Sequence, residues 1–305
     1  MSGVITTGSA PRLLQLGVNA VFNNANKQWE PIYPKLFEVM TAEKGAYEVD
    51  LQMSNMGLAS AKAEGDDIAM DSTRQLFAPK YVHVAYSKGF VVTREAKDDN
   101  KYNYYRKGAQ ALARCMNITR EVRAHTLYNT AFATTSTMTG GDGIAMVSTA
   151  HLNGNGGTYS NRLAIDANFS EASLEDMLKL IMRAKDDRGL ARKLRPMSLI
   201  GHTDQMFEFE RVLNSNLRSG TSDNDMNAVK GTISKGYVLS PYLDSNTKAW
   251  FIRTDAEEGM KFKDRVPLEF GEDMDFGTYN TRYKAYMRFS TGYSDPQGIF
   301  GTQGA

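Results

Sequence analysis

The spacing of apolar residues changes several times along this chain, and each change predicts a different element. Residues 101–132 contain no proline and one glycine, and their apolar side chains recur at steps of three and four residues, the spacing of a helix. The predicted apolar face consists of Tyr105, Ala109, Leu112 and Met116 beside a second row of Ala111, Cys115, Ile118, Val122, His125, Asn129 and Phe132. At roughly 48 Å, this helix would span a compact globule of the same size. Such a helix suits an elongated subunit that tiles with copies of itself. Judged on this stretch alone, a long core helix in an α/β enzyme is the favoured alternative.

Alternating apolar and polar residues predict strands elsewhere. Residues 47–53 and 82–92 alternate, and the chain between them is rich in glycine, aspartate and small residues. We expect residues 46–93 to form a long two-stranded loop that lies on something else, because an isolated ribbon is only marginally stable in water. The most regular alternation, at residues 279–291, predicts a strand with one buried face and one cationic face.

The first 45 residues have the character of an arm. A short amphipathic helix fits residues 12–25, and Pro31 and Pro34 then favour extended chain. Trp29 and Tyr33 must be buried somewhere, and a neighbouring subunit is as suitable a host as the chain's own body.

Residues 166–270 predict an α+β domain. Ser170 begins a helix that Gly189 ends, residues 198–200 form a short strand, and Thr203 begins another helix. The polar run at residues 214–227 predicts a mobile loop, and strands follow at residues 237–239 and 249–252. Helices and strands in this order are typical of an α+β fold.

Composition narrows the class of protein. The 305 residues carry 36 Lys and Arg against 35 Asp and Glu, a net charge of +1, which does not indicate a sequence-reading nucleic-acid binder. The single cysteine, Cys115, excludes an intrachain disulfide and fits a reducing compartment. No apolar run approaches the length of a membrane span, so we expect a soluble protein without membrane contact.

The sequence offers little catalytic chemistry. The four histidines lie at positions 83, 125, 151 and 202 without metal-ligand spacing, so neither a metal nor a cofactor is expected. Ser148, His151 and Asp142 allow a serine hydrolase as an alternative, although no G-x-S-x-G turn surrounds Ser148. We therefore expect no enzyme, with His151 in a structural hydrogen bond.

Two segments and the order of elements resemble a known family. Residues 143–151 (GIAMVSTAH), followed by residues 157–161 (GTYSN) and a Ser-capped helix, resemble the segment after the long helix in major capsid proteins of tailed bacteriophages, particularly Mu-like head subunits. Residues 288–298 (RFSTGYSDPQG) resemble the strand and turn that close those proteins. The whole order of elements resembles the Hong Kong 97-type phage capsid fold.

This resemblance implies a division of the chain. Residues 1–45 would be the N-terminal arm, and residues 46–93 the extended loop lying across a neighbouring subunit. Residues 94–165 and 271–305 would form the peripheral domain around the spine helix at residues 101–132, and residues 166–270 the axial domain at the capsomer centre. Because the chain enters its arm almost directly, a separate scaffolding protein is implied. Lys62 is a loop lysine, but the crosslinking chemistry of one relative is not carried over to it.

The resemblance also implies a function. The chain would assemble with itself into hexamers and pentamers of an icosahedral shell around double-stranded DNA, in the host bacterial cytoplasm, and remain in the virion capsid. Further partners would be a portal and a decoration protein. An encapsulin-like compartment shell and a phage tail subunit are the alternatives.

Two sets of residues are candidates for contacts in such a shell. The intersubunit candidates are Trp29, Tyr33, Lys62, Asp66 and Asp67. The candidates for an inner basic surface, which would hold DNA by diffuse charge without reading its bases, are Arg106, Arg114, Arg120, Arg282, Lys284 and Arg288. The alternative is that they pair with acidic residues of adjacent subunits.

Overall fold

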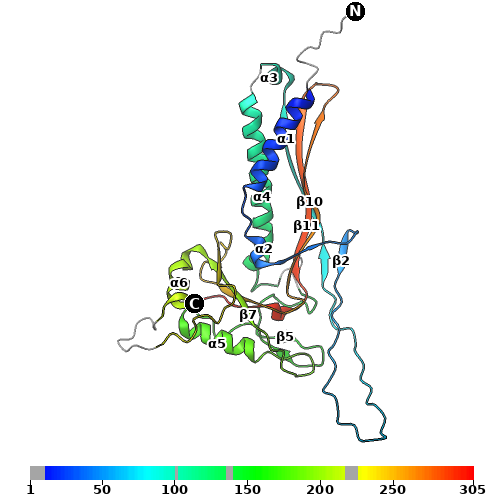
Figure 1. The fold of residues 1–305 in the computed structure, drawn as a ribbon, viewed down its shortest axis with the longest axis vertical. Helices are drawn as coiled ribbons and strands as arrows, with labels where there is room; N and C mark the ends of the chain where they lie inside the picture. The colour runs from blue at the N-terminus through cyan, green and yellow to red at the C-terminus, as the bar shows by residue number, and fades with distance from the viewer. Residues whose placement is uncertain (1–10, 100–101, 135–139, 217–225) are drawn as a thin grey trace, which may run out of the picture.

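The protein is elongated, with a long upper lobe, a smaller lower lobe and a loop that projects beyond both (Figure 1). The computed structural model describes residues 11–99, 102–134, 140–216 and 226–305. Most of the predicted mobile loop at residues 214–227 lies outside these ranges. Helices and strands occur in both lobes, which confirms the predicted α+β class.

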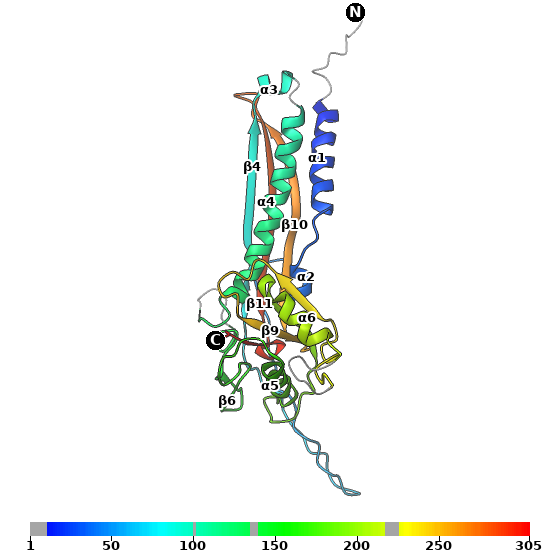
Figure 2. The same cartoon turned by 90° about the vertical axis from the view of Figure 1, so that its left-hand side faces the viewer.

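The upper lobe is a four-stranded sheet covered on one face by helices (Figure 2). In spatial order its strands are β1 (Glu38–Thr41), β10 (Met260–Met274), β11 (Thr281–Tyr293) and β4 (Val84–Val92). The helices are α1 (Pro11–Lys27), α2 (Tyr33–Leu36), α3 (Arg94–Asp98) and the spine helix α4 (Tyr102–Asn129). The helices predicted at residues 12–25 and 101–132 are thus confirmed as α1 and α4.

Alternation along β11 explains how α4 is held. Tyr283, Ala285, Met287 and Phe289 are buried on the helix side. The Tyr283 ring stacks on Phe90 of β4 with centroids 4.9 Å apart. Gly108 allows close approach of the helix, because a Cβ at this position would lie 3.1 Å from the Phe90 ring. The absence of a side chain at Gly108 therefore lets α4 pack directly on the aromatic layer of the sheet.

The lower lobe contains a second four-stranded sheet with its own core. Its strands are, in spatial order, β12 (Ile299–Thr302), β9 (Trp250–Thr254), β7 (Pro196–His202) and β8 (Tyr237–Ser240). Helices α5 (Glu171–Met182) and α6 (Met206–Asn214), a 3-10 turn (Thr203–Gln205) and the short hairpin of β5 (His151–Leu152) and β6 (Thr158–Tyr159) complete it. Trp250, Phe209 and Phe169 pack together at its centre.

Two predicted boundaries in the lower half of the sequence need correction. Ser170 caps α5 as expected, with a capping box to Ser173, but the helix ends at Met182 rather than at Gly189. The chain after Met182 turns back, pairing Lys185 with Ala191, and Gly189 supplies the positive φ of that turn. The predicted boundary between the axial and peripheral domains, at residues 270 and 271, lies inside strand β10. Strand β12, predicted as part of the peripheral domain, lies in the lower sheet. The chain therefore passes between the lobes at residues 255–259 and again at residues 294–298.

Candidate assembly surfaces

The projecting loop is anchored to the upper sheet by a buried ion-pair network. The Lys263 ammonium on β10 lies 2.8 Å from the Glu48 carboxylate and 2.5 Å from the Asp50 carboxylate. Lys261 contacts Asp50 at 2.7 Å and also pairs with Glu258. Both lysines are buried, and Glu48 belongs to β2 (Tyr47–Val49), which pairs with β3 (Lys80–Val82). The root of the loop is therefore fixed to its own subunit.

The pKa values at this root show that the network favours the charged forms. Burial alone would raise the pKa of the Asp50 carboxyl, but hydrogen bonds from Lys261, Lys263 and Ser294 outweigh it and lower the pKa. The pKa of Glu48 is lowered in the same way, with burial opposed mainly by Lys263. For Lys261, burial is outweighed by Asp50 and Glu258, so its pKa is raised. The root is thus most stable when all these groups are ionised.

A buried histidine closes the network. His83 Nδ1 lies 3.0 Å from the Ser290 hydroxyl, and Nε2 lies 3.3 Å from Glu48. Burial lowers the pKa of His83, against the opposing influence of Glu48. Arg288, a predicted member of the basic surface, donates to the carbonyl of His83 at 3.3 Å. Arg288 is therefore a half-buried part of the loop root.

The two arms of the loop are tied to the lower lobe. Arg188 donates to the carbonyl of Asn55 and lies 3.3 Å from Asp71, so it bridges the two arms. The backbone N–H of Asn55 donates to Asp187 at 3.1 Å. Arg74 on the returning arm donates to Asn155 in the β5–β6 turn. These contacts direct the tip of the loop away from the body, as Figure 1 shows.

Beyond these contacts the tip is exposed, including the three predicted intersubunit residues Lys62, Asp66 and Asp67. Between β2 and β3, six large apolar side chains are also more than half exposed, and such a concentration of exposed apolar surface is typical of a contact site. They are Leu51, Met53, Met56, Leu58, Ile68 and Met70. The tip therefore has the composition of a contact surface.

Trp29 and Tyr33, two of the predicted intersubunit residues, contact the subunit's own spine helix. The backbone N–H groups of Ile32 and Tyr33 donate to the Glu121 carboxylate at 2.7 and 3.1 Å. Trp29 adds a side-chain hydrogen bond to the same carboxylate. The Tyr33 ring lies 4.5 Å from that of Phe262 on β10. Glu121 holds this stretch against α4, because it accepts the free N–H groups at the start of α2.

Glu121 is buried, although the helical spacing places it opposite the predicted apolar face. It is the only acidic residue of α4 and is 1% exposed. Burial raises its pKa, although the hydrogen bonds from Ile32 and Tyr33 act against the shift. One turn later, His125 bridges the carbonyl of Glu121 and the Ser240 hydroxyl at 2.7 and 2.8 Å. The arm, the spine helix and the lower sheet therefore meet at this helical turn.

The six basic candidates do not form one surface. Arg106 and Arg114 are exposed on α4, whereas Arg282 and Lys284 lie on the opposite face of the sheet, since they alternate with residues buried under α4. Arg282 pairs with Asp275 at 2.5 Å. Arg120 points inward, with its Cζ 5.8 Å from the Tyr33 ring centroid and its Nε and Nη2 buried. The sequence could not predict this distribution of the basic residues. Arg120 is covered by the arm, and nothing in the residues of α4 shows where the arm packs.

The geometry around Ser148 differs from that of a serine hydrolase. His151 Nδ1 lies 2.7 Å from Asp142, as a structural pair would require, and the histidine is fully buried. The Ser148 hydroxyl accepts from the N–H of Ala150 at 3.2 Å. Within the described chain, His151 Nε2 has no hydrogen-bond partner, so it makes no bond to Ser148.

Among the described residues, no group of His, Cys, Asp and Glu side chains has the arrangement of a metal site. The helices within the same ranges are too short or too polar to cross a lipid bilayer.

Comparison with known proteins gives a family match over most of the chain. The sequence profile of a family described as phage capsid protein matches residues 78–301. No curated protein is similar enough in sequence to count as a relative.

Solved structures with a similar fold come from several particles. A structure of Mycobacterium phage Patience has a TM-score of 0.54 and 10% identity, covering 100% of this chain and 93% of that one. A structure of Mycobacterium phage Che8 has a TM-score of 0.52 and 14% identity, covering 90% and 92%. The virus-like particle from Pyrococcus furiosus has a TM-score of 0.51 and 12% identity, covering 93% and 97%. At these identities the likeness shows the fold alone.

Proposed function

This chain belongs to the phage capsid protein family, and its role is that of a major capsid protein in the virion; we propose that its copies form hexamers and pentamers that close into an icosahedral shell around double-stranded DNA. The observation that carries the proposal is the projecting loop, whose apolar side chains between β2 and β3 stay exposed in the described part of the subunit. Many weak contacts of this kind become strong together when a shell closes.

The domain roles follow the order of elements. We assign residues 1–45 to the arm and residues 46–93 to the extended loop, with β4 as its root in the upper sheet. The rest of the upper lobe is assigned to the peripheral domain and the lower lobe to the axial domain. The ion-pair network at the loop root supports this assignment, because it fixes the direction of the loop while leaving its tip free for a neighbour. Lys62, Asp66 and Asp67 remain our intersubunit candidates. Assembly in the host bacterial cytoplasm with a scaffolding protein and a portal, and later binding of a decoration protein, belong to the same proposal.

The exposed face of α4 is our candidate for the DNA-facing surface. It presents Arg106, Lys107 and Arg114, while the only acid of the helix is buried. The opposite face of the sheet is electrically mixed, because Arg282 pairs with Asp275 and has Asp273 as its strand partner. Exposed cations along one helix face suit contact with phosphates that reads no bases.

Replacing Arg106, Lys107 and Arg114 together by Ala is expected to weaken binding to double-stranded DNA without changing sequence preference. The slope of log K against log salt concentration should fall by about 2 to 3 in magnitude, because each lost phosphate contact removes about 0.9. Filter binding of purified protein across a salt series measures this slope. The control is Arg282→Ala with Lys284→Ala, which should leave it unchanged. Equal changes in both variants would contradict the assignment of the helix face.

An encapsulin-like compartment is less well supported, because the matched family is that of phage capsid proteins. The family is a structural one, and the bonds of Ser148 give the hydrolase alternative no support.

Electron microscopy of the overexpressed full chain, alone and with a candidate scaffolding protein, tests the proposed function. We expect capsomers or closed shells. Protein that stays monomeric at high concentration under all these conditions would contradict it. Shells that enclose protein cargo instead of DNA in infected cells would favour the compartment.

A further inference from the structure

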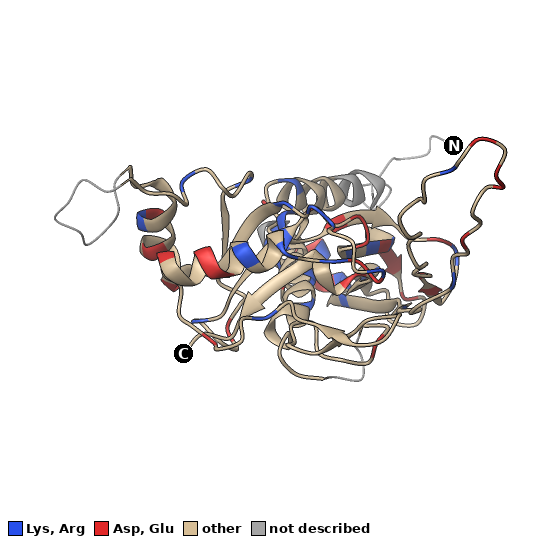
Figure 3. Ribbon diagram, turned by 90° about the horizontal axis from the view of Figure 1, so that it is seen from below, with Lys and Arg blue, Asp and Glu red and all other residues tan. Residues whose placement is uncertain are grey.

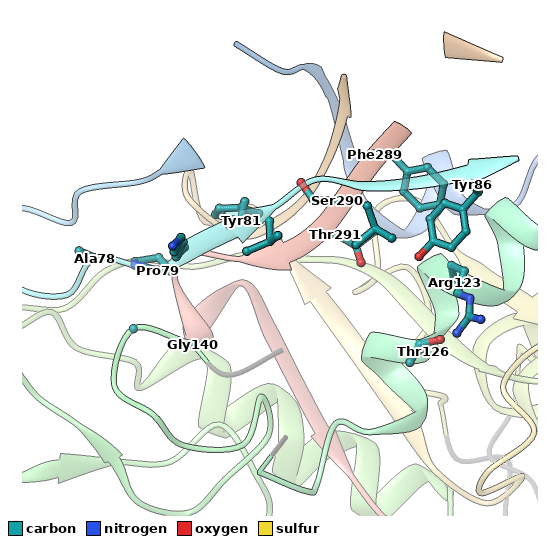
Figure 4. Close-up of a pocket in the computed structure, with 14 residues that line it drawn as sticks. Ala78, Pro79, Tyr81, Tyr86, Arg123, Thr126, Gly140, Phe289, Ser290 and Thr291 are labelled. Carbon is teal, nitrogen blue, oxygen red and sulfur yellow. The ribbon is translucent and has the colours of Figure 1, made fainter. Parts of the chain in front are cut away.

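A cavity of about 640 Å³ lies on the upper lobe, beside the free edge of β4. Its walls come from β3, β4, β11, the C-terminal half of α4 and the turn at Gly140 and Gly141. Figure 4 shows Arg123 and Thr126 of α4 on one side, with Tyr86 and Phe289 of the sheet and Pro79 of the loop root around the rest. The cavity therefore lies where the loop leaves the sheet.

The charge of the lining has one sign. Lys80 and Arg123 are the only charged residues among the lining residues. Lys80 Nζ lies 4.0 Å from the centroid of the Tyr47 ring, and Arg123 Cζ lies 5.8 Å from that of Tyr86. Within the described residues neither cation forms a salt bridge. Each cation therefore packs on an aromatic ring and can still form an ion pair with a carboxylate.

The lining also offers apolar surface. The side chains of Val82 and Val84 are 56% and 47% exposed. An occupant that satisfies the whole cavity would carry carboxylates for the two cations and an aliphatic side chain next to them. Such an occupant must be narrow, because the edge of β4 and the helix enclose it from two sides.

The tip of the projecting loop has this composition. Glu64, Asp66 and Asp67 are exposed and form no salt bridge within the described chain, and Ile68 beside them is 70% exposed. Figure 3 shows acidic segments gathered along this loop. The loop extends up to roughly 50 Å from its root. The Arg74 and Arg188 contacts point it away from the cavity of its own subunit.

We propose that residues 64–68 of one subunit bind in this cavity of a second copy, with the carboxylates at Lys80 and Arg123 and Ile68 against Val82 and Val84. This inference rests on the proposed assembly and names the surface that receives the loop. Since β4 has a free edge next to the cavity, extended chain arriving there can also use its unpaired backbone groups.

Charge reversal on each side tests the contact. Asp66→Lys with Asp67→Lys, and separately Lys80→Glu with Arg123→Glu, should each reduce the yield of assembled particles at least tenfold, measured by sedimentation of the full-length protein. All four substitutions together should restore assembly. Glu175→Lys with Asp176→Lys on the surface of α5, where both acids pair with Lys179, is the control of equal charge change.

Crosslinking between two singly labelled proteins identifies the partner. In a Cys115→Ser background, Asp66→Cys protein mixed with Thr126→Cys protein should give a dimer with a short bismaleimide, whereas Asp176→Cys mixed with Thr126→Cys should not. Assembly without the dimer and without charge rescue would overturn the cavity contact and leave the capsid role intact. Failure of the unaltered protein to assemble at all would overturn both.

Discussion

Lys263→Met is expected to lower the free energy of unfolding of the isolated subunit by about 3 kcal/mol, because it leaves two half-buried carboxylates without their shared, buried cation. Lys263 lies within 2.8 Å of Glu48 and 2.5 Å of Asp50, and its side chain is 6% exposed. Only Lys261 and the neutral hydrogen-bond donors would remain to compensate Asp50. Chemical denaturation measures the loss. Hydrogen exchange should also become faster at β2 and β3, which this lysine fixes to the sheet.

The matched control is Lys235→Met, the same change at an exposed lysine of the lower lobe, for which we expect less than about 0.5 kcal/mol. Combining Lys263→Met with Glu48→Gln should recover part of the loss, since one uncompensated charge is then removed. A Lys263→Met protein as stable as the control would show that the network contributes nothing at the root.

The same network predicts how stability depends on pH. The pKa values of Glu48 and Asp50 are lowered in the folded state, so their stabilisation is present above their ordinary pKa values and is lost as the pH falls through the folded values. The pKa of His83 is also lowered in the folded state, so protonating this histidine below its ordinary pKa destabilises the fold as well. The pKa of Lys261 is raised in the folded state, so its stabilisation is fully present below the ordinary lysine pKa and is lost at higher pH. Denaturation midpoints should therefore be highest between about pH 7 and 10, and the acid loss should be smaller in Lys263→Met.

The sequence predicted the elements whose pattern comes from one buried face. The alternation on β11 and the inner row of α4, from Tyr105 to Met116, are confirmed because a single layer of neighbours covers each. The prediction that the second row of α4 belongs to the buried face is wrong in part. Val122 is 44% exposed, whereas Glu121 is buried, because the arm crosses the helix there and moves its covered side. The residues of α4 alone carry no signal for where the arm crosses the helix.

Strand β10 was missed although its signal is present. Met260, Phe262, Val266, Leu268 and Phe270 alternate with polar residues, but Pro267 lies within the run. The register of β10 shifts between Val266 and Glu269, and β1 pairs only with Lys261 to Asp264, so the missing N–H of Pro267 disrupts no ladder. Without β10, the sequence gives no reason to place Lys261 and Lys263 next to Glu48 and Asp50. The ion-pair network at the loop root could therefore not be predicted.

Glu121→Gln is expected to destabilise the subunit by about 2 kcal/mol and to release the arm. The carboxylate gives one oxygen to Ile32 N–H and the other to Tyr33 N–H. A glutamine has one acceptor oxygen, and its NH₂ group would face the second N–H, leaving a donor unsatisfied in a buried position. The effect should be smaller than that of Lys263→Met because burial raises the pKa of Glu121, which shows that holding the ionised form there already has a cost.

Two measurements separate the arm from global stability. Denaturation gives the change in unfolding free energy, and limited proteolysis under native conditions should cut Glu121→Gln faster near residues 27–32, where the arm leaves α1. Asp176→Asn, the same isosteric change on the exposed side of α5, serves as the control and should change neither. If Glu121→Gln is cut no faster than this control, the carboxylate does not hold the arm. Because His125 joins the same turn to Ser240 of the lower sheet, His125→Ala should increase exchange at β8 while leaving cleavage of the arm close to that of the unaltered protein.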